Sequence, residues 1–273
     1  MWLITRKLRE AAKLLVLSPL NFRRDIRFRR EVLRTNAALP DLTRYERRVY
    51  SQNGEDGILQ AIFARIGTTN RYFVEFGAED GAQCNTRYLA EHHGWRGLLL
   101  DARYDNPTRS LHREFVTAEN INFLFTKYHV RPEFDLLSID IDGNDLWVWN
   151  SIDPRWRPRV VVIEYNSSVG PSACLTIPYD EAFYWDGTTY FGSSLQALCA
   201  LAELRGYALV ACDSRGVNAF FVRTDLVTTL GKPTPPERLF RPPYYGRHLC
   251  GHPVSTQNLV PYEVGRDPII NDE

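Results

Sequence analysis

Residues 134–145 read FDLLSIDIDGND, an apolar run that ends in three acids within six residues. Phe134 to Asp140 has the length and composition of a buried strand, and Leu146 to Ile152 follows as a helix. Because side chains alternate along an extended chain, Asp140 and Asp142 point to the same side. The segment therefore predicts a strand whose carboxyl end carries paired carboxylates.

Strands and helices continue to alternate on both sides of this segment. Apolar strands that alternate with helices predict a parallel α/β sheet with helices on both faces. The last two strands are joined by DSRGVN, a hairpin-type turn, so the last strand is expected to be antiparallel. The expected strands are 72–76, 97–101, 134–140, 160–165, 207–212 and 219–223, and the expected helices are 58–66, 86–92, 108–115, 117–126, 146–152 and 193–205.

Open parallel sheets bind ligands at the carboxyl ends of their strands. The first strand ends in EFGAEDG, which contains Glu75, Gly77 and Gly81. Glu79 stands where the dinucleotide fingerprint GxGxxG has its second glycine, and the acids of this loop would repel a pyrophosphate. They tolerate a cationic ligand without phosphates, such as the sulfonium of S-adenosylmethionine. A tight turn with no ligand is the alternative interpretation.

The second strand ends at Asp101, 24 residues after Gly77. An acid at this place can accept hydrogen bonds from both ribose hydroxyls of an adenosine. The spacing occurs in nucleotide-binding and in methyltransferase sheets, so it does not choose between them.

Acids and amides also end the strand that follows, in Glu164-Tyr-Asn166. Together with Asp140 and Asp142 they form an oxygen-rich group on adjacent strands, which suits Mg²⁺. The same carboxylates suit a general base that works without metal. An acid that caps the helix starting at Leu146 would explain one of these carboxylates but not all of them.

Several aromatic residues lie near these acids in the sequence, and their faces would suit a sugar or an aromatic acceptor. They are Trp147, Trp149, Tyr165 and Trp185. Packing in the core is the alternative, because Trp147 and Trp149 cannot both face the same side of a helix.

The chain has 273 residues, and its 33 basic and 33 acidic side chains balance. This neutrality argues against a wholly basic nucleic-acid binder. Residues 1–48, however, hold 13 Lys and Arg against 5 Asp and Glu, and read as a basic helical arm. We expect the arm to contact anionic lipid, a second copy of the chain or the body. Residues 49–230 are the expected domain, and 231–273 a Pro-rich tail packed on it.

The cysteines are odd in number, five, and show no zinc-ligand spacing, so we expect buried thiols in a reducing compartment. No run reaches the roughly 18 apolar residues of a membrane span, and no signal peptide is recognised. These features predict a cytoplasmic protein, with the arm as a potential peripheral contact to the inner membrane face.

Seven segments between residues 50 and 225 form an ordered set. They are SQNGEDGIL (51–59), FVEFGAEDG (73–81), CNTRYL (84–89), GWRGLLLDA (94–102), DLLSIDIDGNDLWVW (135–149), VVVIEYN (160–166) and GYALVACDSRGVNAFFVR (206–223). This set resembles the FkbM-type methyltransferases, in the branch with an SQxGED opening and a DIDGND signature. One departure is Cys84, where relatives often have serine.

The resemblance implies a class I methyltransferase fold, a Rossmann-like sheet of seven strands with the last one antiparallel. It implies an S-adenosylmethionine-dependent enzyme that methylates a hydroxyl of a sugar, glycan, glycolipid or natural product. The implied cofactor-binding residues are Glu75, Gly77, Gly81, Asn85, Thr86 and Asp101. Asp140 and Asp142 match the acids beside the methyl group, with Asp142 as the first candidate for the base.

Two other functions are compatible with the sequence. One is a nicotinamide-dependent oxidoreductase on a similar sheet, against which the missing glycine and the acidic loop count. The other is a methyltransferase-like binding module without catalysis, against which the acids at three strand ends count.

Overall fold

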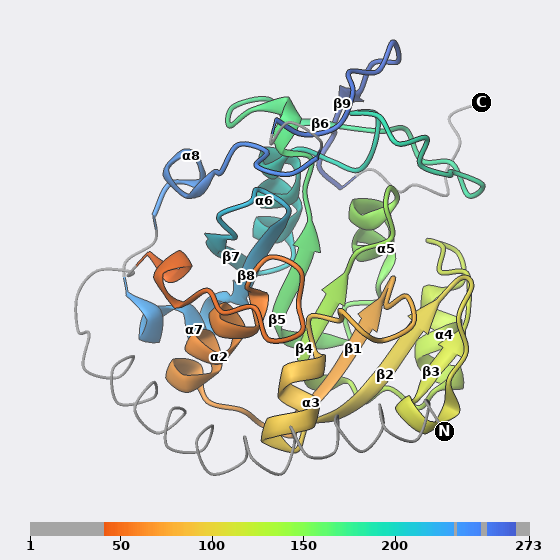
Figure 1. Ribbon diagram of the computed structural model, residues 1–273, viewed down its shortest axis with the longest axis vertical. Coiled ribbons are helices and arrows are strands. Elements are labelled where there is room, and N and C mark those ends of the chain that lie inside the picture. The colour runs from red at the N-terminus through yellow and green to blue at the C-terminus, as the bar shows by residue number, and fades with distance from the viewer. Residues whose placement is uncertain (1–40, 232–233, 247–249, 266–273) are drawn as a thin grey trace, which may run out of the picture. The chain divides into compact units, whose positions relative to one another are not determined.

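The computed structural model describes residues 41–231, 234–246 and 250–265 (Figure 1). Residues 1–40, which hold most of the predicted basic arm, lie outside the described residues, and so do its predicted contacts. No described helix combines the length and the apolar composition that crossing a membrane requires.

A seven-stranded sheet forms the centre of the described chain. Its order is β3 (Leu111–Arg113), β2 (Arg96–Asp101), β1 (Tyr72–Phe76), β4 (Glu133–Ile139), β5 (Arg157–Glu164), β8 (Asn218–Arg223) and β7 (Tyr207–Cys212). Only β8 runs antiparallel to its neighbours, and it lies between β5 and β7. This is the class I methyltransferase arrangement, as the closing hairpin and the resemblance predicted.

Helices cover both faces of the sheet (Figure 1). One face packs against α4 (Ile121–Lys127), α5 (Asp145–Ser151) and α6 (Leu195–Leu204), whose apolar side chains join alternate strand residues in one buried cluster. The other face carries α2 (Glu55–Ile66) and α3 (Arg87–His93). Burial on both faces explains why the central strands are almost continuously apolar in sequence.

The prediction of a helix over residues 108–115 is wrong. A short 3₁₀ turn, Pro107–Arg109, is followed by the edge strand β3, which pairs with β2 through Leu99 and Leu111. Ser110 between them has a φ of +54°, which no helix accommodates. Edge strands this short carry too few residues for a period-2 pattern, so the tertiary pairing decided the structure.

The helix expected from residue 117 begins later, at Ile121. The Thr117 hydroxyl still accepts a hydrogen bond from the Asn120 amide at 3.3 Å, but it closes the turn before the helix. The sequence predicts Thr117 as the cap of this helix, and that prediction is wrong: Asn120 precedes the helix, and its side chain makes no cap hydrogen bond.

The chain after β5 includes β6 (Leu175–Thr176), which pairs with β9 (Val260–Pro261) near the end of the described chain. Tyr262 beside β9 is buried and packs edge-on against Trp147, with ring centroids 5.8 Å apart. The segment that follows β5 and the late part of the chain are therefore held together next to α5.

Gly77, directly after β1, lies against the backbone that follows β4. A Cβ atom there would lie 1.5 Å from the backbone oxygen of Asp140, which follows β4. The Gly77 amide donates to the Leu100 carbonyl of β2 at 3.0 Å, and its φ is +70°. The loop after β1 can therefore pass between the ends of β2 and β4 only because this position has no side chain.

We expect Gly77→Ala to destabilise the protein through two effects. The left-handed backbone costs a non-glycine residue about 1–2 kcal/mol, and overpacking against Asp140 adds about 1–3 kcal/mol. Gly94→Ala is the matched control, because its φ is +67° but nothing lies within 4 Å of its Cβ position. Urea unfolding should show the larger loss for Gly77→Ala; equal losses would contradict the steric argument.

Candidate active site

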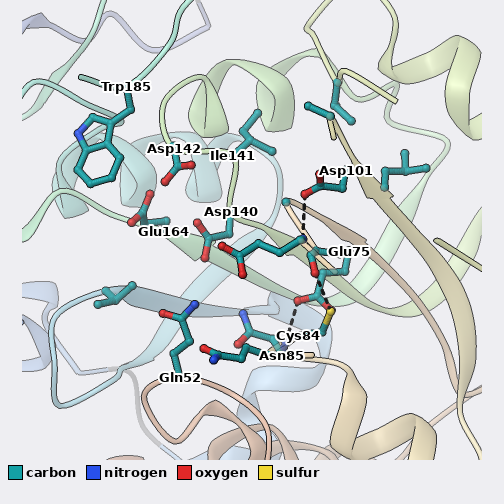
Figure 2. Close-up of a pocket in the computed structure, with 18 of the residues that line it drawn as sticks. Gln52, Glu75, Cys84, Asn85, Asp101, Asp140, Ile141, Asp142, Glu164 and Trp185 are labelled. Atoms are coloured by element: carbon teal, nitrogen blue, oxygen red, sulfur yellow. Dashed lines mark hydrogen bonds between the residues drawn. The ribbon is translucent and has the colours of Figure 1, made fainter. Parts of the chain in front are cut away.

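A cavity of about 650 Å³ opens at the carboxyl ends of β1, β2, β4 and β5 (Figure 2). This is the edge of the sheet at which the sequence predicted a site. Seven predicted site residues line it: Glu75, Gly77, Asn85, Asp101, Asp140, Asp142 and Glu164. Gly81, Thr86 and Asn166 are not among the residues that line it.

Glu75 points from β1 toward the loop that follows Gly81, and three hydrogen bonds hold its carboxylate there. It accepts from the backbone amide of Asn85 at 2.8 Å, and from the backbone amide and the hydroxyl of Thr86 at 3.1 and 2.5 Å. Burial raises the pKa of Glu75 to about 7, although these hydrogen bonds oppose the shift. Glu75 and Thr86 thus shape the cavity wall by fixing the loop.

Gly81 and Asn166 also have structural partners. The Gly81 carbonyl accepts a hydrogen bond from Arg109 at 2.8 Å. The Asn166 amide donates to the carbonyls of Thr189 and Phe191, both at 2.9 Å. The Asn166 side chain is therefore engaged by the segment after β5, and it does not line the cavity with the acids that it was expected to join.

Asp101 ends β2 and organises the loops at the cavity entrance. Its carboxylate accepts from the backbone amides of Glu79 and Arg103 at 2.8 Å and of Tyr104 at 3.1 Å. Glu79 has a φ of +47°. A non-glycine residue in this region marks a strained loop, and such loops are frequent at functional sites.

Asp140, Asp142 and Glu164 form a carboxylate cluster in the cavity. One ligand oxygen of each lies within 4.8 Å of those of the other two. The Glu164 Oε2 atom is buried and has no hydrogen-bond partner among the described residues. Three like charges at this separation, one of them unsatisfied, need protons or a cation to be compensated.

The pKa values of all three clustered carboxyls are raised. Burial is the main cause of each shift. The second cause is the charge of Asp142 for the pKa of Asp140, and the charge of Asp140 for the pKa of Glu164. For the pKa of Asp142, the next contribution is the charge of Glu79. Asp142 is the most exposed of the three, and its φ of +61° places it on a strained turn.

Asp145, the third acid of residues 134–145, has a different role. Its carboxylate accepts from the amides of Ile141 and Gly143 at 2.9 and 2.8 Å, and it is fully buried at the start of α5. Asp145 thus fits the helix-start interpretation, while Asp140 and Asp142 stay available to the cavity.

Residues that sequence reasoning did not assign to the site line the cavity too. They include Gln52, Asn53 and Glu55 from the SQNGED motif, Asn144 and Asn218, and Phe183, Tyr184, Tyr245 and His252. The motif itself was visible in the sequence, but nothing in it indicated which strand end it would meet. Of the four aromatic residues noted from the sequence, only Trp185 lines the cavity, and the other three are buried in the core.

No protein-family model matches the chain, and no curated protein is similar to it. Among solved structures, the mitomycin 7-O-methyltransferase MmcR is similar at 14% sequence identity over 73% of this chain and 67% of that one, with a TM-score of 0.28. The strand order itself identifies the class I methyltransferase fold. The FkbM-type resemblance stays a prediction.

We expect Glu164→Gln to stabilise the protein at pH 8 in EDTA, by about 1–3 kcal/mol. The raised pKa means that folding opposes ionisation of Glu164. The contribution of Glu164 to the free energy of unfolding is complete below its ordinary pKa of 4.5, where the carboxyl is protonated. That contribution is lost as the pH rises through the raised pKa of the folded protein. The gain from the substitution should therefore shrink at pH 5, as measured by urea unfolding.

Asp186→Asn provides a control of opposite sign. Hydrogen bonds from Thr188 lower the pKa of Asp186, so this change should lose rather than gain stability at pH 8. A Glu164→Gln protein less stable than wild type at pH 8, or equally affected at both pH values, would show that the cluster is not electrostatically strained.

Proposed function

We propose that the protein is an S-adenosylmethionine-dependent O-methyltransferase. The observation that carries the proposal is that one cavity holds both an acid at the end of β2 and a cluster of three carboxylates. Asp101 lies at the end of β2, and the cluster of Asp140, Asp142 and Glu164 lies at the ends of β4 and β5. The first suits the ribose of an adenosine, and the second suits activation of a hydroxyl.

The residues present fit this cofactor. The cavity is lined by Glu79 and Asp101 on the side of β1 and β2, next to the glycine turn at Gly77. Among the described residues that line it, Arg103 is the one Arg or Lys side chain. Such a surface suits a sulfonium cation and disfavours a pyrophosphate. When bound, S-adenosylmethionine supplies an electrophilic methyl group.

The carboxylate cluster fits a divalent cation. Asp140, Asp142 and Glu164 provide three oxygen ligands of the kind that Mg²⁺ prefers, and the unsatisfied Glu164 oxygen would gain a partner. Asn166, included in the predicted ligand set, is held elsewhere by Thr189 and Phe191. When bound, Mg²⁺ supplies a positive charge that acidifies a neighbouring hydroxyl.

The cation and a free carboxylate base are alternatives, and in the version without a cation Asp142 is the residue we assign to proton transfer. An alcohol becomes a good nucleophile only as its proton leaves, so a carboxylate oxygen must take the hydroxyl proton while the oxygen–methyl bond forms and the sulfur–methyl bond breaks. Asp142 is the most exposed member of the cluster, and its raised pKa suits a base that works near neutrality. The charge of Asp142 raises the pKa of the neighbouring Asp140, so a second negative charge beside Asp142 is disfavoured.

An oxidoreductase that binds a nicotinamide cofactor remains the alternative of a different class. We expect S-adenosylhomocysteine to bind and NAD not to bind in isothermal titration. Asp101→Asn should weaken S-adenosylhomocysteine binding by about tenfold or more, because a charged hydrogen-bond acceptor is lost. Asp105→Asn, an exposed acid outside the cavity lining, is the control. Binding of NAD without S-adenosylhomocysteine would reverse the proposal.

The cation assignment has a test that does not depend on turnover. Mn²⁺ used as a paramagnetic probe should bind the wild-type protein, and Asp142→Asn should weaken this binding by about tenfold or more, because an anionic ligand loses its charge. Glu79→Gln removes an acid from the same cavity but not from the cluster, so it should bind Mn²⁺ nearly as well as wild type. Equal Mn²⁺ affinity in the two variants would contradict the assignment.

A further inference from the structure

The SQNGED motif forms a part of the cavity to which the proposed function assigns no role. Gln52, Asn53 and Glu55 line the cavity, and Glu55 is the first residue of α2. Burial is the largest cause of the raised pKa of Asp140, and the charge of Glu55 is one of the smaller causes. The motif therefore lies within electrostatic reach of the carboxylate cluster.

Hydrogen bonds on both sides of Gln52 fix the turn that carries it. The Asp56 carboxylate accepts from three consecutive backbone amides, those of residues 49–51, at 2.8, 2.7 and 3.1 Å. After Gln52, the backbone amide of Asn53 donates to the Glu55 carboxylate at 2.8 Å. The backbone at Gln52 is thereby held in one place relative to α2 and the cavity.

The Gln52 side chain itself is exposed and lines the cavity. It makes no hydrogen bond to any residue in the part of the chain that the structure describes. Its neighbours in the motif differ, because Ser51 is buried and the Asn53 side-chain amide donates to Glu55 at 3.2 Å. A primary amide on a fixed turn, with its donor and its acceptor both unused, is well placed to contact a ligand.

Gln52 approaches the carboxylate cluster from a direction of its own. In Figure 2, Asp101, Asp142 and Gln52 lie on three different sides of Asp140. The sulfur of S-adenosylmethionine bears three substituents, which are the ribose, the methyl group and the chain of an α-amino acid. The proposed function places the ribose at Asp101 and the methyl group at the cluster. The third substituent is then directed toward Gln52.

The charge of the cavity limits which residues can hold an α-amino acid. Its described lining includes eight carboxyl groups, which repel the carboxylate of such a ligand. The side-chain amide of Asn85 already donates to the Ser138 hydroxyl at 3.1 Å. The Arg103 guanidinium donates to the Tyr184 hydroxyl and lies 5.5 Å from the centroid of that ring. These two donors are therefore engaged within the protein.

Gln83 is another exposed amide of the lining. It follows Gly81, where a Cβ atom would lie 3.9 Å from the Leu99 side chain of β2. The loop that carries Gln83 thus lies on the β2 side of the cavity, where Asp101 is found. Gln52 is the amide on the side that is left for the amino acid.

We propose that Gln52 binds the α-amino-acid end of the cofactor. Its Nε2 atom donates to the α-carboxylate, which the acids of the cavity cannot do. The inference rests on the proposed function, because it assigns the third substituent of the sulfonium to the SQNGED turn. An uncharged amide suits this place, since a carboxylate here would add to the repulsion.

Isothermal titration of the full chain with three adenosine ligands tests the assignment. S-adenosylhomocysteine carries the whole amino acid, its decarboxylated analogue keeps only the amine, and methylthioadenosine lacks both groups. Gln52→Ala should weaken S-adenosylhomocysteine binding by about tenfold, because a hydrogen bond to a charged group is lost. The same variant should bind methylthioadenosine within about twofold of wild type, because that ligand does not reach Gln52.

Gln52→Glu should affect two of these ligands in opposite directions. The new carboxylate repels the α-carboxylate of S-adenosylhomocysteine and attracts the amine of the decarboxylated analogue. The first ligand should therefore bind about tenfold more weakly than to wild type, and the second as tightly or more tightly. A substitution that only disturbed the fold would weaken the binding of both.

Gln83→Glu is the matched control, because it makes the same change of charge in the same cavity. It should not shift the two ligands in opposite directions. Wild-type affinity for S-adenosylhomocysteine in both Gln52 variants would overturn the assignment, and so would opposite shifts in Gln83→Glu instead of Gln52→Glu. Either result leaves the proposed function standing, because the cofactor product still binds. A wild-type protein that binds neither S-adenosylhomocysteine nor methylthioadenosine would contradict both proposals.

Discussion

The close approach of Gly77 to the backbone of Asp140 is the constraint on which the cavity depends. Space for a Cβ atom is missing there, so the loop after β1 lies directly against the end of β4. That contact brings the loop held by Glu75, Asp101 at the end of β2 and the acids after β4 to one edge of the sheet. A wider separation would leave the same side chains at the same strand ends without a shared cavity.

Carboxylates are used in two physically different ways around this edge. Glu75 and Asp145 are buried but satisfied by backbone amides, and so they stabilise the loops next to them. Asp140, Asp142 and Glu164 are crowded together, and a buried oxygen of Glu164 lacks a partner. Unsatisfied buried charge lowers stability, and proteins retain it mainly where a ligand or a reaction compensates for it.

The far side of the cavity depends on parts of the chain that are irregular. Aromatic rings reach the cavity lining from the segment between β5 and α6 and from the chain beyond α8 (Pro236–Leu239). A backbone hydrogen bond from the Thr189 amide to the Pro253 carbonyl, at 2.9 Å, holds these segments against each other. The rigid sheet thus positions the acids, and the surrounding irregular segments decide what can lie next to them, as is common where loops carry specificity.

The sequence by itself determined the alternation of strands and helices, the antiparallel last strand and the acids at the strand ends, because these depend on local periodicity and strand polarity. Side-chain alternation predicted that Asp140 and Asp142 lie together, but both follow the end of β4, and Asp142 lies on a turn with a φ of +61°. Tertiary structure decided that Glu164 joins them while Asn166 binds the Thr189 carbonyl, and that residues 111–113 form an edge strand instead of a helix. It also decided that Tyr245 and His252 reach the cavity, since pairing between segments some 60 residues apart leaves no local pattern in either of them.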